Sequence, residues 1–254
     1  SVFVFGYSGW TDKARLANTK SFSQSVRSTL TAYPIAFWNL NDTGSTIVDE
    51  LGTNNCTLSG GGNLAEGVFD KAVNFTGSNF INCGNPSGLR VTGSMTLSFW
   101  AKPSNVASPS RQNPICKAYG GEFCLTMEPY GSLSYFHGSC GGNCGPYIGW
   151  SLPNMFVNNK WVHVLIVRDN QTRSLKGYKN GKLVAQRTWT SDYDPKDSSN
   201  IFYISRGYVY YFRGVIDDVR IFSEPFTIAQ VKQLYAEGLA KRGLTEELAE
   251  LASR

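Results

Sequence analysis

The chain of 254 residues is poor in charge and has no concentrated patch of either sign. Only 17% of its residues are charged, and its 24 Lys and Arg residues are scattered instead of alternating with aromatic residues in a run. A surface that binds nucleic acid needs clustered basic side chains to neutralise phosphates. The sequence therefore predicts no nucleic-acid partner.

The sequence also has no long hydrophobic run. Its apolar stretch at residues 2–7 is far shorter than the ~20 residues that a membrane-spanning helix needs. No basic segment precedes this stretch, so the pattern of a cleavable signal peptide is missing. We expect a further apolar segment to precede Ser1.

Familiar catalytic motifs are missing as well. We find no nucleotide-binding glycine loop, no zinc-protease motif and no Gly-x-Ser-x-Gly segment. A glycoside hydrolase needs two carboxylates about 5 to 9 Å apart across the scissile bond. Glu122 and Glu128 bracket a predicted strand, while Asp217 and Asp218 are adjacent and should point to opposite faces of theirs. His163 alternates with apolar residues, as a packing residue does. We predict that the protein is not an enzyme.

Six cysteines are present, and their even number and spacing favour disulfides. Four of them lie between positions 116 and 144, which raises zinc as the alternative, but no CxxC spacing occurs and His137 is the only nearby imidazole. Disulfides imply an oxidising, extracytoplasmic setting. Of the fifteen connectivities that six cysteines allow, we predict Cys56 with Cys83, Cys116 with Cys124, and Cys140 with Cys144.

After Pro34 the sequence changes to short alternating runs separated by turn signals. The aromatic content of 13% and the 26 glycines suit strands and tight turns, respectively. The pair Asn180-Gly181 predicts a two-residue hairpin turn. Many short strands at regular spacing predict an antiparallel β-sandwich. We expect strands at 95–102, 123–127, 132–137, 161–168, 175–179, 182–189, 201–205 and 215–222.

Helical spacing is confined to the two ends of the chain. Apolar residues recur from Trp10 to Leu30 at intervals that predict one long helix, which Pro34 ends. Near the other end, Thr227 caps a predicted helix that Gly243 stops, and Thr245 caps a second one. The expected domains are residues 1–34 (an α-helical stalk), 35–238 (the β-sandwich) and 239–254 (a helical tail).

Five blocks of the predicted sandwich resemble laminin-G-like domains, the concanavalin-type or pentraxin-like jelly-roll lectins. They are AFWNLND at 36–42, GVFDKAVNFTGSNFINCGN at 67–85, TLSFWAKP at 96–103, KWVHVLIVRDNQTRSLKGYKNGKLV at 160–184 and GVIDDVRIF at 214–222. Their order matches the order in that family. The resemblance implies a mainly β jelly-roll fold and an extracellular binding role, without naming a ligand.

The segment DKARLANTKSFSQSVRSTLTAY at 12–33 resembles the helix that follows the membrane segment in type IV pilin-like proteins. This implies a homo-polymer held by the N-terminal helix, with contact to the inner membrane before assembly. The family's cleavage motif, leading Phe and Glu are missing here. The residues expected in assembly are Val2, Phe3, Phe5, Trp10, Ala14, Ala17, Phe22 and Val26.

Calcium is the expected cofactor, if there is one, because hard cations prefer carboxylate and amide oxygens. Asp49 and Asn54 lie around a glycine turn, and the laminin-G-like resemblance implies that Asp217 or Asp218 lies nearby. The alternative is that Asp49 and Asn54 form an Asx-type turn and that the aspartate pair binds backbone amides.

Aromatic residues in predicted loops are the candidates for stacking on sugar rings. We expect Tyr147 and Trp150 in a loop rich in Gly and Pro, and Trp189 and Tyr193 beside an Asp-rich loop. The alternative for these residues is a subunit contact, where aromatic side chains also concentrate.

Together these patterns predict a structural subunit of an extracellular type IV pilus-like filament on a bacterial cell surface, displaying a laminin-G-like adhesive domain. A calcium-dependent module that binds cell-surface glycans without forming a polymer is the alternative.

Overall fold

The computed structural model describes residues 34–244. The predicted stalk helix and all its assembly residues therefore lie outside the described residues, as does the second C-terminal helix expected after Thr245. The assembly residues concerned are Val2, Phe3, Phe5, Trp10, Ala14, Ala17, Phe22 and Val26.

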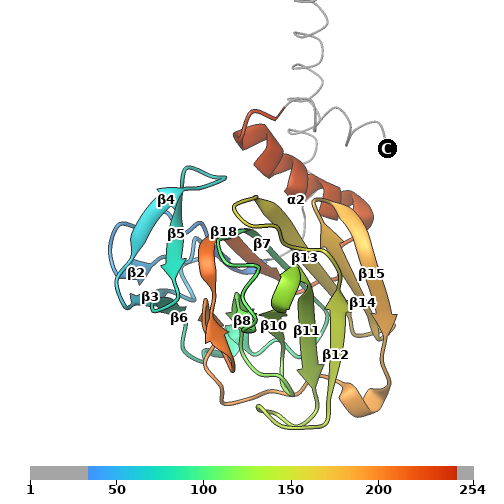
Figure 1. The fold of residues 1–254 in the computed structure, drawn as a ribbon. Helices are drawn as coiled ribbons and strands as arrows, with labels where there is room; N and C mark the ends of the chain where they lie inside the picture. The colour runs from blue at the N-terminus through green and yellow to red at the C-terminus, as the bar shows by residue number, and fades with distance from the viewer. Residues whose placement is uncertain (1–33, 245–254) are drawn as a thin grey trace, which may run out of the picture.

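The described residues form two β-sheets stacked face to face (Figure 1). The first sheet has eight strands, and its order begins at one edge with β15 and ends at the other with β4, while β1 pairs with β18. In sheet order the strands are β15 (Lys182–Thr188), β14 (Ser174–Lys179), β13 (Val162–Asp169), β7 (Met95–Pro103), β18 (Arg213–Phe222), β5 (Lys71–Thr76) and β4 (Asn63–Glu66), with β1 at Pro34–Trp38.

The second sheet has ten strands, of which β8 (Gln112–Asn113) and β17 (Tyr210–Tyr211) pair beside β10. Three short 3-10 helices, Ser87–Leu89, Pro129–Gly131 and Ser191–Tyr193, lie in the connections. The other strands in sheet order are β12 (Tyr147–Leu152), β11 (Leu133–Gly138), β10 (Cys124–Met127), β9 (Ile115–Cys116), β16 (Tyr203–Ile204), β6 (Phe80–Asn82), β3 (Cys56–Ser59) and β2 (Thr46–Ile47).

The core lies between the two sheets and consists of side chains from alternate strand positions. Trp38 of β1 stacks on Phe202 with ring centroids 5.6 Å apart. The central strands β7 and β13 are buried along nearly their whole length, not on one face only. Their second face is covered by helix α2, which explains why both read as continuous apolar runs in the sequence.

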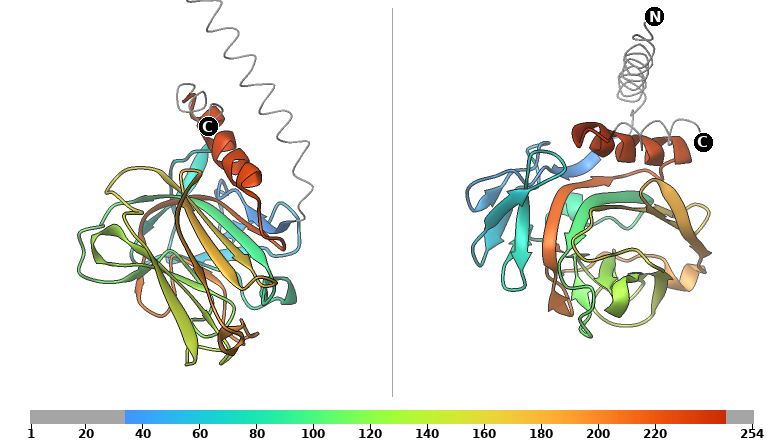
Figure 2. Two further views of the ribbon diagram at one scale, coloured as in Figure 1. Left: turned by 90° about the vertical axis from the view of Figure 1, so that its right-hand side faces the viewer. Right: turned by 45° about the horizontal axis from the view of Figure 1, so that its top comes forward.

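Helix α2 (Ile228–Lys241) lies across the outer face of the first sheet (Figures 1 and 2). Thr227 begins it with a capping box, because the Thr227 hydroxyl accepts from the amide of Gln230 while the Gln230 side chain accepts from the amide of Thr227. Gly243 follows the helix with φ 68°, a left-handed conformation that favours glycine. Both predicted helix ends are confirmed. The helix runs unbroken across position 238, where the sequence-based domain boundary divides the sandwich from the helical tail.

The closest approach of α2 to the sheet is made by Gly238 against Trp100. A Cβ atom at position 238 would lie 2.2 Å from Trp100 Cζ2. We expect Gly238→Ala to lower the free energy of unfolding by about 1 to 3 kcal/mol, because overpacking outweighs the gain in helix propensity of about 1 kcal/mol. Urea unfolding measures this, and Ala240→Ser on the exposed side of the helix should change the free energy by less than about 0.5 kcal/mol. A Gly238→Ala variant more stable than the parent protein would contradict the contact.

The turn between β14 and β15 forms as the sequence predicts. Asn180 and Gly181 have φ angles of 50° and 71°, the left-handed pair that a two-residue turn of this kind requires. The antiparallel pairing of Lys179 with Lys182 closes this hairpin.

Three disulfides connect the six cysteines in the predicted pairs. Cys56–Cys83 joins β3 to the end of β6, Cys116–Cys124 crosses between paired positions of β9 and β10, and Cys140–Cys144 closes a loop between β11 and β12. Three disulfides indicate that the protein folds in an oxidising, extracytoplasmic compartment. No helix among residues 34–244 has the length and hydrophobicity to cross a membrane.

Candidate functional site

The outer face of the second sheet carries an unusual number of aromatic side chains. On β11, Leu133 and Tyr135 belong to the core, so Phe136 points to the opposite, outer face. Tyr147, at the start of β12, is opposite Gly138 of β11 and is 47% exposed. Aromatic rings on the solvent side of a sheet bury nothing in the core, and they mark this face as a candidate binding surface.

Four of these rings form one cluster, which we call the tyrosine face: Tyr119, Phe136, Tyr147 and Tyr208. Tyr119 is its buried centre, with ring centroids 4.5 Å from Phe136, 6.1 Å from Tyr147 and 5.3 Å from Tyr208. The contacts of Tyr119 with Tyr147 and Tyr208 are edge-on. Tyr208 is 67% exposed. Two exposed tyrosines thus flank a buried aromatic centre.

Two disulfide-closed loops hold the centre of the tyrosine face in place. The Tyr119 amide donates to Asn143 Oδ1 at 3.1 Å, and its hydroxyl hydrogen-bonds with Thr126 Oγ1 at 3.0 Å. Gly120 pairs with Gly142 of the Cys140–Cys144 loop, and a Cβ at position 120 would lie 2.0 Å from the Cys144 carbonyl oxygen. Only glycine allows this approach, so the two loops act as one rigid support for Tyr119.

A charged pair borders the tyrosine face. Arg111 donates from Nε and Nη2 to the two carboxylate oxygens of Glu128, each at 2.8 Å, and its guanidinium lies 5.7 Å from the ring centroid of Phe136. Hydrogen bonding to Glu128 raises the pKa of Arg111 above its ordinary value, while partial burial opposes the rise. The guanidinium of Arg111 therefore stays charged, and the pair supplies oriented polar atoms beside the aromatic rings.

A second aromatic cluster continues the same face toward β6. The guanidinium of Arg206 lies 4.6 Å from the ring centroid of Phe80, 4.9 Å from that of Tyr203 and 5.7 Å from that of Tyr211. Neighbouring Tyr210 is 69% exposed, and its amide donates to the Arg111 carbonyl, which links the second cluster to the tyrosine face. The two clusters together offer more aromatic surface than a single sugar ring would need.

The structure separates the four aromatic residues that the sequence offers for sugar stacking. Tyr147 is exposed, but Trp150 and Trp189 are buried core residues and Tyr193 is partly buried against the same core. Tyr147 and Trp150 also lie on strand β12 instead of in a loop. The strand alternates exposed and buried positions, so Tyr147 faces out while Trp150 faces in. Trp150 and Trp189 thus stabilise the core and offer no ring face to a ligand in solvent.

The residues expected to hold calcium have other partners. The carboxylate of Asp49 accepts hydrogen bonds from the amides of Phe37, Leu51, Thr53 and Asn54, and from the side chains of the last two. These amides hold the pKa of Asp49 below its ordinary value although burial opposes them. The arrangement is that of an Asx-type turn. A cation at Asp49 would have to displace these donors, so the donor set does not fit a calcium site there.

Asp217 and Asp218 hold different parts of the fold. Asp217 Oδ2 accepts from the amides of Val68 at 2.6 Å and Phe69 at 2.9 Å, while Oδ1 has no hydrogen-bond partner among residues 34–244. Asp218 lies at an irregularity in β18, with φ 52°, and pairs with Arg220, which also binds Glu237 of α2. No group of three or more His, Cys, Asp or Glu side chains suited to a metal gathers within residues 34–244. Asp217 is therefore a loop anchor in this geometry.

The anchor at Asp217 should make stability depend on pH. Burial and, to a smaller extent, the neighbouring Asp218 raise the pKa of Asp217, the two amides lower it, and the net value is about 7. The native state then keeps a proton that the unfolded state releases near pH 3.9. The free energy of unfolding therefore falls as pH rises from about 4 to 7.

We expect Asp217→Asn to remove this loss. The free energy of unfolding of the variant relative to the parent should rise by up to about 1.4 kcal/mol per pH unit between pH 4 and 7. Urea titrations at each pH measure it, with the exposed Asp192→Asn as the control that gives a pH-independent difference. A flat difference for Asp217→Asn would show that the aspartate is ionised throughout this range.

Both histidines are structural. His163 packs against the rings of both Trp100 and Tyr235 and hydrogen-bonds with Ser98 Oγ through Nε2 at 2.8 Å. His137 packs against Trp189 with ring centroids 4.7 Å apart. Burial lowers the pKa of each imidazole to about 3. Both rings are neutral at physiological pH and neither reaches solvent as a base.

One cavity of about 310 Å³ lies apart from the tyrosine face. Segments of residues 42–45, 61–64, Leu58 and Val73 line it, and no aromatic ring is among them. It offers hydroxyl and amide groups but no stacking platform, so the tyrosine face is the stronger candidate site.

The chain matches the model of a known family over residues 75–232, the concanavalin A-like lectin/glucanases superfamily (Laminin_G_3). No curated protein sequence is detectably similar to it. Among solved structures, domain 4 of AbnA, a GH43 extracellular arabinanase from Geobacillus stearothermophilus, in complex with arabinotriose, is similar with a TM-score of 0.63 and 19% identity. The alignment covers 80% of this chain and 98% of that domain.

Binding domains of toxins have the same fold. The receptor binding domain of botulinum neurotoxin mosaic serotype C/D has a TM-score of 0.62 and 17% identity, over 80% of this chain and 50% of that one. The binding domain of Paraclostridial Mosquitocidal Protein 1 has a TM-score of 0.62 and 16% identity, over 79% and 51%. The chain thus spans about half the length of these toxin domains. Because the family model covers well over half of the sequence, the chain belongs to the concanavalin A-like lectin/glucanases superfamily.

Proposed function

We propose that the protein is a carbohydrate-binding module that holds an extended glycan across the tyrosine face and the adjoining Arg206 cluster. The observation that carries this proposal is the pair of exposed tyrosines, Tyr147 and Tyr208, each of which packs edge-on against the buried Tyr119. The similar arabinanase domain was solved with arabinotriose, and the toxin domains are described as receptor-binding, which supports a binding role for this fold.

The chemistry of the face suits sugars. One side of a pyranose or furanose ring presents C–H groups, which pack on aromatic rings, while its edge presents hydroxyl groups. Tyrosine provides both an apolar ring and a polar tip, and it loses little conformational entropy on binding because it has few rotatable bonds. The Arg111–Glu128 pair supplies donors and acceptors to ring hydroxyls beside Phe136.

The proposed activity is binding without cleavage. Glu128 is the carboxylate that borders the tyrosine face, and both of its oxygens accept from Arg111. Glycoside hydrolysis needs a second carboxylate at a set distance and an acid that carries a proton. Arg111 occupies both carboxylate oxygens of Glu128, which suits a binding group better than a general acid.

Screening of the full chain on a glycan array, followed by calorimetry with the best ligand, tests the proposal. We expect binding in the micromolar to millimolar range that aromatic stacking with few hydrogen bonds supports. Parallel runs with added calcium and with a chelator separate calcium-dependent from calcium-independent binding. Absence of binding to any plant, bacterial or animal glycan class in both conditions would overturn the proposal.

The filament role expected from the sequence is a separate hypothesis, and it depends on residues outside the described part of the chain. The apolar stripe from Trp10 to Leu30 favours it, because a helix of that pattern needs a partner to cover its apolar face. Electron microscopy of material sheared from the native cells tests it directly. Filaments containing this chain would make the module a displayed adhesin, and dispersed monomers would leave only the binding role.

A further inference from the structure

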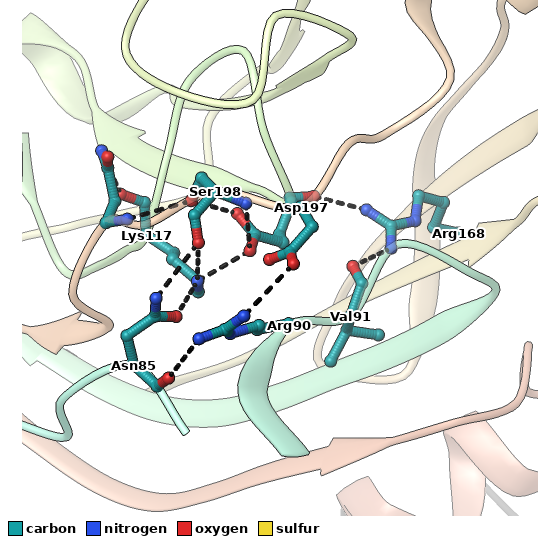
Figure 3. Close-up of polar contacts among 9 residues, drawn as sticks. Asn85, Arg90, Val91, Lys117, Arg168, Asp197 and Ser198 are labelled. Carbon is teal, nitrogen blue, oxygen red and sulfur yellow. Dashed lines mark hydrogen bonds and ion pairs between the residues drawn. The ribbon is translucent and has the colours of Figure 1, made fainter. Parts of the chain in front are cut away.

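A buried group of polar side chains lies between the two disulfides nearest to β6 and β9, and two of its members, Lys117 and Glu122, belong to the Cys116–Cys124 loop that carries Tyr119. Lys117, directly after Cys116, and Glu122, two residues before Cys124, form an ion pair of 2.7 Å between side chains with no exposed surface. Lys117 Nζ also donates to Asn85 Oδ1 at 2.7 Å (Figure 3). A fully buried ammonium is costly, so this arrangement calls for an explanation beyond chance.

We propose that Lys117 and Asn85 form an intramolecular isopeptide bond, with Glu122 as the base that removes the proton from the amine. The three groups that such a reaction needs are present and in contact: an amine, a carboxamide as acyl donor, and a carboxylate on the amine. A carbonyl C=O bond is about 1.23 Å long, so Asn85 Cγ lies no more than about 4 Å from Lys117 Nζ. This is close to the ~3–3.5 Å of a near-attack conformation.

The surroundings hold both reacting groups in position. Asn85 Nδ2 donates to the Ser198 carbonyl at 3.2 Å, and Lys117 Nζ donates to the same oxygen at 3.3 Å. Glu122 accepts from the Ser198 amide at 3.0 Å and from its hydroxyl at 2.7 Å. Ser198 therefore fixes the nucleophile, the acyl donor and the base together. Arg90 covers the group by donating to the Asn85 carbonyl and pairing with Asp197 (Figure 3).

The reaction balances without an oxidant or a cofactor. The Lys117 ammonium gives one proton to the Glu122 carboxylate, and the neutral amine attacks Asn85 Cγ. The bond from Cγ to Nδ2 breaks, and the departing nitrogen takes a second proton from the amine and leaves as ammonia. Ammonia carries the proton off Glu122 as ammonium, which leaves a secondary amide between the two side chains and an ionised Glu122.

The burial of Lys117 and Glu122 favours the reaction. The Lys117 ammonium and the Glu122 carboxylate are in direct contact, so a proton can pass between them without an intervening group. Exclusion of water protects the tetrahedral intermediate and the product from hydrolysis. The backbone at Asn85 precedes Pro86, which has no amide N–H, so the usual competing attack of the next amide on the asparagine side chain is blocked.

Mass spectrometry of the full chain tests the proposal. After reduction of the disulfides, the measured mass should be lower than that of the sequence by one ammonia, about 17 Da. Because the Asn180-Gly181 turn could lose ammonia by cyclising, the site must be located by peptide mapping. We expect the tryptic peptide of residues 72–90 joined to the peptide that contains Lys117, with no cleavage after Lys117.

Two variants supply the controls. Asn85→Ala should have the full mass of its own sequence and release a free peptide ending at Lys117. Asn200→Ala, which loses only a 3.3 Å contact to the Lys117 backbone carbonyl, should keep the bond. Folded Glu122→Gln protein should lack the bond between Lys117 and Asn85, because the base is missing. Recovery of separate, unmodified peptides containing Asn85 and Lys117 from the folded parent protein would overturn the proposal, and the triad would be an ion-pair network only.

Discussion

Replacement of Arg168 by methionine is expected to lower the free energy of unfolding by at least about 3 to 4 kcal/mol. Arg168 lies on β13, is completely buried, and points between the sheets. Its guanidinium donates to the carbonyls of Gly93, Val91 and Glu122 and to the hydroxyl of Tyr135. It thereby ties the first sheet to the loop at 91–93 and to the β10–β11 side of the second sheet.

The effect is large because a buried acceptor that loses its donor costs more free energy than the hydrogen bond contributed. Methionine fills similar volume but removes the donor from the buried carbonyls of Val91 and Glu122, each of which costs about 1 to 3 kcal/mol, and from the part-buried carbonyl of Gly93. The substitution also removes the cost of burying the Arg168 guanidinium, so the net loss of stability is smaller than the sum of the costs at the carbonyls. Urea unfolding under non-reducing conditions measures the difference.

The matched control for this substitution is Arg187→Met. Arg187 is exposed on β15 and donates only to the Gly149 carbonyl, so its loss should change the free energy by less than about 0.5 kcal/mol. An Arg168→Met variant within about 1 kcal/mol of the parent would show that the freed carbonyls find water or new donors.

Local patterns were enough to predict much of this fold. The strand alternation, the Asn180-Gly181 turn and the Thr227 cap each depend on residues close in sequence, and all three form as expected. The very short strands β2, β8, β9 and β17 are set by their partners and carry no periodic signal of their own. The Gly and Pro residues before β12 predict a loop there, but residues 147–152 form a strand with regularly alternating exposed and buried positions.

The candidate site was harder to predict because distant segments assemble it. Tyr119, Phe136, Tyr147 and Tyr208 come from four separate parts of the chain, and only their folded positions bring the rings together. The dense aromatic run at 207–212 was the available signal for Tyr208. For the predicted stacking residues, exposure in the fold separates binding candidates from core residues. Sequence alone cannot distinguish the exposed ring of Tyr147 from the buried ring of Trp150.

If the tyrosine face binds glycan, Tyr147→Ala and Tyr208→Ala should each weaken affinity by about tenfold, which is 1.4 kcal/mol. The double variant should weaken it by about a hundredfold, because the two exposed rings do not touch in the described contacts but only share Tyr119. Calorimetry with the best ligand from the array measures both. Circular dichroism and the unfolding midpoint should stay unchanged, since neither ring is buried in the core.

The control for this experiment is Leu183→Ala, an exposed apolar residue of β15 on the first sheet that should leave the dissociation constant within about twofold. The pattern of losses also tells apart the two parts of the surface. If Tyr210→Ala weakens the binding of long oligosaccharides but not of short ones, the Arg206 cluster binds the far end of the ligand. A short ligand on Tyr147 and Tyr208 would not reach that cluster. Wild-type affinity in the Tyr147/Tyr208 double variant would move the binding site off this face, and the cavity at residues 42–45 and 61–64 would then be the next surface to mutate.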